Sequence, residues 1–206
     1  YLDYAVWQQQ HMRSDGFKAG LAYWQNKLAD APAVHQLPLD NNRQAHEQDN
    51  SAVLQRVLPI ELTQQIQAVM QQHSLTEFMF FHAALVVLIN KYSYQQDIVI
   101  GTPVANRNNS QLESLLGLFV NTIPLRIELA EQMDIQQLFE QVKQTNLAAL
   151  QHQDVPFDLL IESLKVSRSS LFNPLCQIML SINNTPELEL NAEDMAFKLT
   201  QLHTDT

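Results

Sequence analysis

The chain has 206 residues, of which 46% are hydrophobic and 17% charged, a composition typical of one sizeable globular domain or a large part of one. Its formal charge of -10 argues against nucleic acids and anionic membranes as partners, because both bind clustered Lys and Arg. The single cysteine, Cys176, excludes an intrachain disulfide framework and a cysteine-based metal site, and it fits a reducing cytoplasm.

The N-terminal part combines a helical segment with a polar connection. In residues 3–28 apolar side chains recur at three- and four-residue steps, which predicts helix, while Gly16 and Gly20 predict a kink. Residues 31–50 are polar and contain two prolines, so we interpret them as a connection.

The next segment predicts a strand and two helices. AVLQRVLP, residues 52–59, alternates like a strand, and Pro59 is placed to open a helix. Ser74, with Glu77 three residues later, predicts a capping box for a second helix. The apolar run in that helix, residues 78–89, is much shorter than the roughly 20 residues of a membrane span. We therefore expect a buried helix and no membrane partner.

Two strands and two helices are predicted beyond this point. DIVIGTPV, residues 97–104, indicates a short buried strand, and FVNTIPLRIEL, residues 119–129, alternates as a longer one. Asp134 and Gln137 predict a cap for a helix, and a short helix follows Pro156. The apolar stripe of the longer helix comprises Ile135, Leu138, Phe139, Val142 and Leu150.

The C-terminal part predicts two further strands, LCQIMLSI at residues 175–182 and AFKLTQL at residues 196–202. Strands that alternate with helices indicate a layered α/β (α+β) architecture, which we expect to be a two-layer sandwich. We find no internal repeat and no interior linker, so a single unit is expected.

No string in the chain encodes a self-contained catalytic group. The seven histidines show neither HExxH nor a paired metal-ligand spacing, so we expect no metal site. His82 lies inside the apolar helix and is interpreted as a core histidine with satisfied hydrogen bonds. IGTPVANR, residues 100–107, lacks the Lys-Ser/Thr sequel of a phosphate loop, and no GxSxG elbow is present.

Five strings in a fixed order nevertheless resemble a known family. They are YLDYAVWQ (1–8), IGTPVANR (100–107), LLGLFVNTIPLR (115–126), HQDVPFDLLI (152–161) and NPL (173–175). Their order and spacing closely resemble those of nonribosomal peptide synthetase condensation domains, and GLFVNT together with HQDVPF is specific. The family's last motif approximates RDxSRNPL, whereas this chain has RSSLFNPL. The turn into the strand is kept, while the polar contacts of the usual Asp, Ser and Arg stay open.

The resemblance implies a domain larger than this chain. Condensation domains join two lobes, each like a chloramphenicol acetyltransferase monomer, with a mixed central sheet flanked by helices. Residues 1–206 correspond to most of the C-terminal lobe. The N-terminal lobe, with the HHxxxDG signature, is expected upstream of Tyr1, and the last C-terminal elements are expected after Thr206. No catalytic residue is therefore expected in this fragment.

The resemblance also implies partners rather than a bound cofactor. Donor and acceptor peptidyl carrier protein domains would dock at opposite mouths of a tunnel between the lobes and present thioesters on phosphopantetheine arms. The acceptor amine would attack the donor thioester, giving an amide. An adjacent adenylation domain and the missing N-terminal lobe are the other expected partners, and the expected location is the cytoplasm.

Within this lobe the resemblance points to candidate residues of the tunnel wall. Asn173 resembles the family's Asn at the mouth of the site, with a strand-capping turn residue as the alternative. Asn121 and Thr122 lie in the GLFVNT strand near the lobe interface, with plain strand structure as the alternative. The segment from Gly101 to Ser110 resembles the loop that passes under the tunnel and bridges the lobes.

HMRSDG, residues 11–16, matches the tail of HHxxxDG by chance. It follows YLDYAVW, a motif that lies after the family's signature, and Gln10 stands where the first His belongs. We therefore interpret His11 as part of a packing helix without a catalytic role.

Two alternative functions remain open from the sequence. The chain could belong to an epimerization domain of the same superfamily, or to a non-catalytic lobe that only docks carrier proteins. The sequence upstream distinguishes an enzyme, with an intact HHxxxDG, from a docking platform, with a degenerate one.

Overall fold

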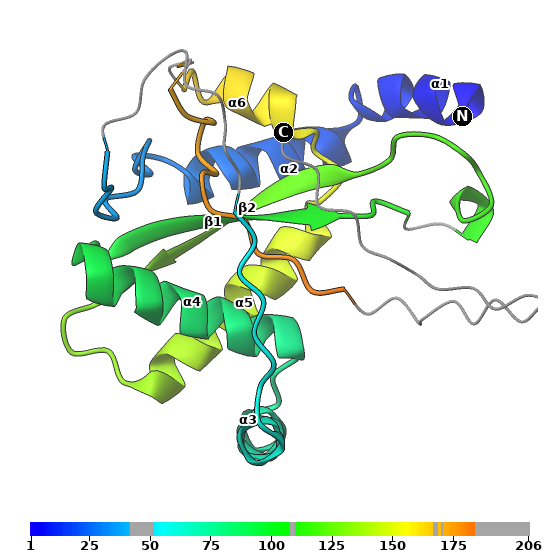
Figure 1. Cartoon of the computed structure of the whole chain (residues 1–206). Helices are drawn as coiled ribbons and strands as arrows, with labels where there is room; N and C mark the ends of the chain where they lie inside the picture. Colours follow the sequence, from blue (N-terminus) through cyan, green and yellow to red (C-terminus); the bar gives the residue numbers. More distant parts are fainter. Residues whose placement is uncertain (42–51, 108–109, 167–168, 170, 184–206) are drawn as a thin grey trace, which may run out of the picture.

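A pair of antiparallel strands lies between two groups of helices (Figure 1). The computed structural model describes residues 1–41, 52–107, 110–166, 169 and 171–183. β1 (Asp97–Val104) and β2 (Asn121–Glu128) pair along their whole length. Both bounds of β1 agree with the prediction. β2 is buried continuously over residues 123–127 instead of alternating, because helices cover both faces of the strand pair.

α4 (Glu77–Ser93) and α5 (Ile135–Gln151) cover one face of the strands. The predicted capping box of α5 is confirmed. The Asp134 carboxylate accepts from the Gln137 backbone amide at 2.8 Å, and the Gln137 side-chain oxygen accepts from the Asp134 backbone amide at 3.0 Å. The core on this side contains Val86, Ile89, Ile98, Ile100, Ile127, Leu138 and Val142. Of the predicted stripe of α5, the two end residues, Ile135 and Leu150, are exposed.

α1 (Leu2–His11), α2 (Asp15–Lys27) and α6 (Phe157–Ser163) lie on the other side (Figure 1). The predicted kink at Gly16 and Gly20 is wrong in place, since both glycines lie within α2 and the chain instead breaks between the two helices at residues 12–14. The Ser14 hydroxyl accepts from the Phe17 amide at 3.1 Å and caps α2. Gly20 lies buried inside α2, where an added Cβ would lie 3.1 Å from the Val155 side chain. This close approach brings α2 against the turn that precedes α6.

Arg126 joins the end of α2 to the strand pair. Its guanidinium makes two bonds to the Asp97 carboxylate, at 2.9 and 2.7 Å, and donates to the Lys27 and Ala29 carbonyls. Arg126 is buried, at 7% exposed, and the Asp97 hydrogen bonds raise its pKa against the opposing effect of burial, so the side chain stays charged.

The boundary between α3 (Ile60–His73) and α4 corrects the predicted cap. Ser74 ends α3 in a left-handed conformation, with φ 52°, and so cannot serve as the N-cap of α4. Thr76 takes that role two residues later, accepting from the Met79 amide at 3.2 Å. α3 does begin after Pro59 as predicted, but none of its residues is buried.

The other predicted strands differ from the structure. Residues 52–59 form no strand, because they do not pair with β1 or β2. All of them are exposed. Residues 175–182 contribute only one parallel bridge, Met179 to Gly101, since a sharp turn at Leu175 breaks the first half. The predicted strand at 196–202 lies outside the described residues.

Membrane-spanning helices and metal-binding groups can be sought only in the described part of the chain. No single helix there is long and apolar enough to cross a membrane; α3 and α4 pass only as a pair, and they are bent by 104°. No group of three or more His, Cys, Asp or Glu side chains in these ranges could hold a metal ion.

Candidate functional site

A groove of about 530 Å³ lies between the start of β2, α6, Ser169 and residues 172–179. Two of the predicted site residues, Thr122 and Asn173, line it together. The remaining wall is mostly apolar, with Asp158 at the exposed edge. The other lining residues are Phe157, Ile161, Ser169, Phe172, Pro174, Cys176 and Met179. The fold thus joins two residues that lie 51 positions apart in the sequence.

The NPL turn beside the groove has a strained backbone. Leu175 is buried and has φ 59°, a conformation that branched non-glycine residues rarely adopt. The Cys176 amide donates to the Pro174 carbonyl at 2.6 Å and closes the turn. Gln177 anchors it from the far side by donating to the Asn173 carbonyl at 2.6 Å and the Ala33 carbonyl at 2.9 Å. Strain of this kind clusters at functional sites.

Asn121 lies next to the groove but uses its side chain elsewhere. Its amide nitrogen donates to the carbonyls of Gln153 and Val155, both at 2.8 Å, and its amide oxygen accepts from the Phe157 amide at 3.0 Å. The side chain therefore holds the HQDVPF turn against β2. This geometry favours the structural alternative for Asn121 over direct contact with a substrate.

Gly101 lies in β1 under the groove, where Met179 and Cys176 cover it. Its amide donates to the Ile178 carbonyl and its carbonyl accepts from the Leu180 amide, each at 2.9 Å. Burial raises the pKa of the Cys176 thiol to about 12, so the thiol stays protonated and unreactive at neutral pH. The groove therefore has a sulfur-rich floor without a nucleophile.

Ser110 is not part of the groove. It opens the short 3-10 helix η1 (Ser110–Leu112) and is exposed. Arg107 holds this loop, since its guanidinium donates to the carbonyls of Leu112 and Leu115 and lies 4.2 Å above the Phe119 ring. Of the predicted Gly101–Ser110 segment, Gly101 thus lies at the groove floor and Ser110 at a different surface.

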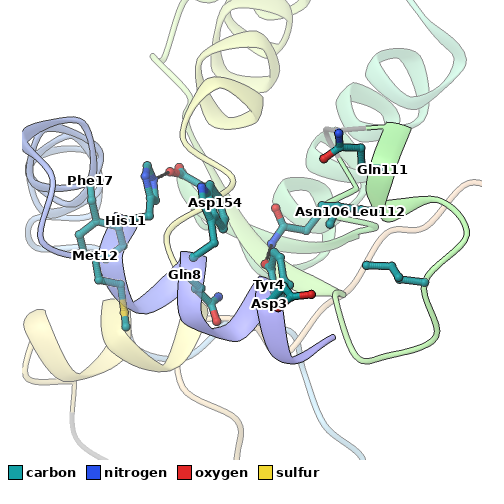
Figure 2. Close-up of a pocket in the computed structure, with 12 residues that line it drawn as sticks. Asp3, Tyr4, Gln8, His11, Met12, Phe17, Asn106, Gln111, Leu112 and Asp154 are labelled. Carbon is teal, nitrogen blue, oxygen red and sulfur yellow. Dashed lines mark hydrogen bonds and ion pairs between the residues drawn. The ribbon is translucent and has the colours of Figure 1, made fainter.

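A second hollow, of about 520 Å³, lies between α1, the turn after α5, Asn106 and residues 111–115. Figure 2 shows His11 and Asp154 facing one another there, with 2.5 Å between the His11 Nε2 and the Asp154 carboxylate. The His11 ring stacks on Trp7 with centroids 5.0 Å apart. The Tyr4 hydroxyl accepts from the Asn106 side-chain amide at 3.3 Å, and burial raises the pKa of Tyr4.

His11 makes a structural contact, since its ring pairs with Asp154 and stacks on Trp7, and the absence of a catalytic role for it stays a prediction. It connects the end of α1 to the turn that Asn121 holds from the other side. The sequence reasoning missed Asp154 as its partner, although the residue stands inside the HQDVPF string.

The histidine expected to be satisfied in the core is only half satisfied. His82 is fully buried, and its Nδ1 lies 3.1 Å from the Asn146 side-chain oxygen. Its Nε2 and the Asn146 amide nitrogen have no partner within the described residues. Burial lowers the pKa of His82 to about 4, so the ring is neutral at pH 7.

The sequence of the chain matches a known protein family over its whole length. The family model described as "Condensation domain" matches residues 1–206. The chain belongs to the condensation-domain family. Malpinin synthetase of Mortierella alpina is 37% identical over 190 residues, 92% of this chain and 2% of that protein. The dimodular nonribosomal peptide synthase of Bacillus subtilis is 36% identical over 205 residues, 97% of this chain and 9% of that protein.

Solved structures of condensation-type domains confirm the predicted α/β fold class. A four-domain nonribosomal peptide synthetase, holo-AB3403 bound to AMP and glycine, matches with a TM-score of 0.77 and 31% identity, over 83% of this chain and 13% of that one. The X-domain from teicoplanin biosynthesis matches with a TM-score of 0.79 and 26% identity, over 86% of this chain and 40% of that one. The chain thus spans only a small part of the synthetases that it matches.

Proposed function

We propose that this chain is most of the C-terminal lobe of a nonribosomal peptide synthetase condensation domain and forms one wall of its substrate tunnel. The reaction is amide formation between aminoacyl or peptidyl thioesters on donor and acceptor carrier protein domains. The upstream lobe supplies the HHxxxDG signature, and an adenylation domain lies nearby in the same synthetase. The reaction takes place in the cytoplasm.

The groove lined by Thr122 and Asn173 is the observation that carries this proposal. Two motif residues from distant parts of the chain meet there beside a strained turn, on a domain of the right family. The wall has an exposed amide at its edge and a floor of Cys176, Met179 and Ile161. Such a surface can hold an acyl chain by apolar contact while Asn173 bonds a substrate amide.

The physical task of this wall is positioning. Two tethered thioesters that are held in reacting geometry avoid much of the entropic barrier to a bimolecular reaction. No general base is required from this lobe, because the HHxxxDG histidine of the other lobe handles the amine proton. The protonated Cys176 thiol matters here, since a thiolate beside the tunnel could capture the acyl group. The substrates arrive on phosphopantetheine arms, and no other cofactor is needed.

Replacing Asn173 with Ala in the complete two-lobed domain tests the proposal. We expect condensation to slow by roughly 5- to 150-fold, the equivalent of about 1–3 kcal/mol for one polar contact to the transition state. The measurement is single-turnover amide formation between loaded donor and acceptor carriers. Asn26→Ala, an exposed site on α2, is the matched control and should leave the rate unchanged. An unchanged rate for Asn173→Ala would return Asn173 to a turn-forming role.

A docking lobe without catalysis is the second candidate. The observation in its favour is a solved complex of the teicoplanin X-domain with OxyB, in which a similar fold is bound to another protein. The upstream sequence separates the two functions, because an intact HHxxxDG indicates an enzyme and a degenerate one indicates a docking lobe. An epimerization domain is separated from both by assaying the stereochemistry of the carrier-bound substrate.

A further inference from the structure

Met179 rests on a glycine at the floor of the groove. The backbone on both sides of Met179 is fixed to Gly101, through the Ile178 carbonyl and the Leu180 amide, each at 2.9 Å. An added Cβ at Gly101 would overlap the Met179 sulfur and lie 2.9 Å from the Cys176 Cβ. The missing side chain of Gly101 is therefore what lets the thioether lie flat on β1.

The Met179 side chain also faces the groove. It is one of the lining residues and remains 49% exposed, although the backbone on either side is hydrogen-bonded to a buried strand. Methionine is unbranched and adapts its shape to what packs against it. A rigid backbone with an adaptable side chain at the floor is a suitable arrangement for setting the depth of a pocket.

We propose that Met179, seated on Gly101, sets the size of the side chain that the groove admits from a carrier-bound acyl substrate. The ligand class is an apolar aminoacyl thioester of moderate size. This rests on the proposed function for the identity of the ligand, while the binding itself can be measured without catalysis. Neither residue belongs to the reacting groups, so both act on specificity.

The geometry predicts opposite effects for two kinds of variant. Met179→Ala deepens the groove and favours bulky side chains. Gly101→Ala displaces the thioether from β1 towards the groove, and Met179→Phe fills the same space directly, so both favour small side chains. One extra or missing methylene in an apolar pocket changes discrimination by about 10- to 200-fold, so a shift of about tenfold is expected for each variant.

The experiment measures the binding of two probes to the complete two-lobed domain. The probes are the N-acetylcysteamine thioesters of leucine and tryptophan, and the readout is the ratio of their dissociation constants. We expect Met179→Ala to shift this ratio about tenfold towards tryptophan, and Met179→Phe and Gly101→Ala to shift it towards leucine. With labelled methionine methyl groups, saturating probe should move the NMR signal of Met179 and leave that of Met70, on α3, in place.

Matched controls separate the local effect from general damage. At Gly16 an added Cβ meets nothing closer than 3.8 Å, so Gly16→Ala should leave the ratio unchanged, as should Met70→Ala. Met179→Phe keeps the test valid if Gly101→Ala fails to fold. Equal ratios in all variants, or an unmoved Met179 signal, would overturn the inference. Shifted ratios in a domain that forms no amide from loaded carriers would instead reject the proposed condensation activity and retain the groove as a selective binding site.

Discussion

At the scale of single residues, Asn121 makes three side-chain hydrogen bonds beside the groove. Its two donors and its acceptor are all used on the turn between α5 and α6, at 2.8 to 3.0 Å. That turn carries Asp154 towards one hollow and Phe157 towards the other. One side chain therefore positions a wall of both hollows.

We predict that Asn121→Ala in the complete domain lowers the free energy of unfolding by about 3 kcal/mol, roughly 1 kcal/mol for each lost hydrogen bond. Asn121→Asp should be similarly damaging, because a carboxylate can accept from Phe157 but would face the carbonyls of Gln153 and Val155. Urea denaturation followed by circular dichroism measures both. Asn173→Ala is the control, and we expect it to cost less than about 0.5 kcal/mol at its exposed position. A stable Asn121→Asp variant would show that the two donated bonds are dispensable.

At the scale of elements, α4 and α5 meet through a buried polar pair. His82 on α4 and Asn146 on α5 share one hydrogen bond of 3.1 Å, and each has a nitrogen without a partner in the described residues. A polar group that is buried without a hydrogen-bond partner lowers the free energy of unfolding. The same two helices contribute apolar side chains to the core, among them Val86 of α4 and Val142 of α5.

The His82 pKa gives this interface a pH dependence. The pKa is about 4 in the folded chain and 6.5 is its ordinary value, so the unfolded chain binds the proton more tightly. The stability contributed by neutral His82 is complete above pH 6.5 and is lost as the pH falls towards 4, by about 3 kcal/mol in total.

We predict that the double variant His82→Leu and Asn146→Ala is at least as stable as the natural sequence at pH 7. It should also lose less stability between pH 6.5 and 4, because no buried imidazole then takes up a proton. Unfolding in urea at a series of pH values measures the difference. The single variant His82→Leu is the comparison, since it leaves the Asn146 amide without its partner. Parallel stability curves for the double variant and the natural sequence would contradict the argument.

At the scale of the whole molecule, apolar side chains gather where α1 meets the segment before β2. The Tyr1 hydroxyl donates to the Leu118 carbonyl at 3.0 Å, which places the start of α1 beside that segment. Leu116 is 94% exposed, Leu118 78% and Leu2 77%. An exposed patch of this kind is typical of a surface that packs against another part of a protein.

We predict that the isolated 206-residue chain forms no amide between loaded carriers and associates with itself. Its charge of -10 opposes association at low ionic strength, so added salt should strengthen self-association by screening that repulsion. Sedimentation velocity at about 20 and about 500 mM salt measures the oligomer, and Leu116→Glu with Leu118→Glu should weaken it. Measurable amide formation by this chain alone would contradict the assignment of the catalytic histidine to another lobe.

The sequence alone determined the elements whose signals are local. β1 and the Asp134 cap follow from a buried apolar run and from a side chain that bonds its own helix end, so neighbours in sequence suffice. The ordered motifs likewise identified the family without any coordinates. The same reasoning placed a strand at 52–59, where the alternation is present but no ladder partner lies within the described residues.

Tertiary structure decided the contacts between distant residues. The residues near Asn121 in sequence do not predict that its side-chain amide bonds the turn at residues 153–157. Those near His11 do not predict its contact with Asp154. Met179 was missed for the same reason, because its role depends on the absence of a side chain at Gly101, 78 positions earlier. Hydrogen bonds and close packing act over about 3–4 Å in space, whatever the separation along the chain, and only the folded arrangement sets those distances.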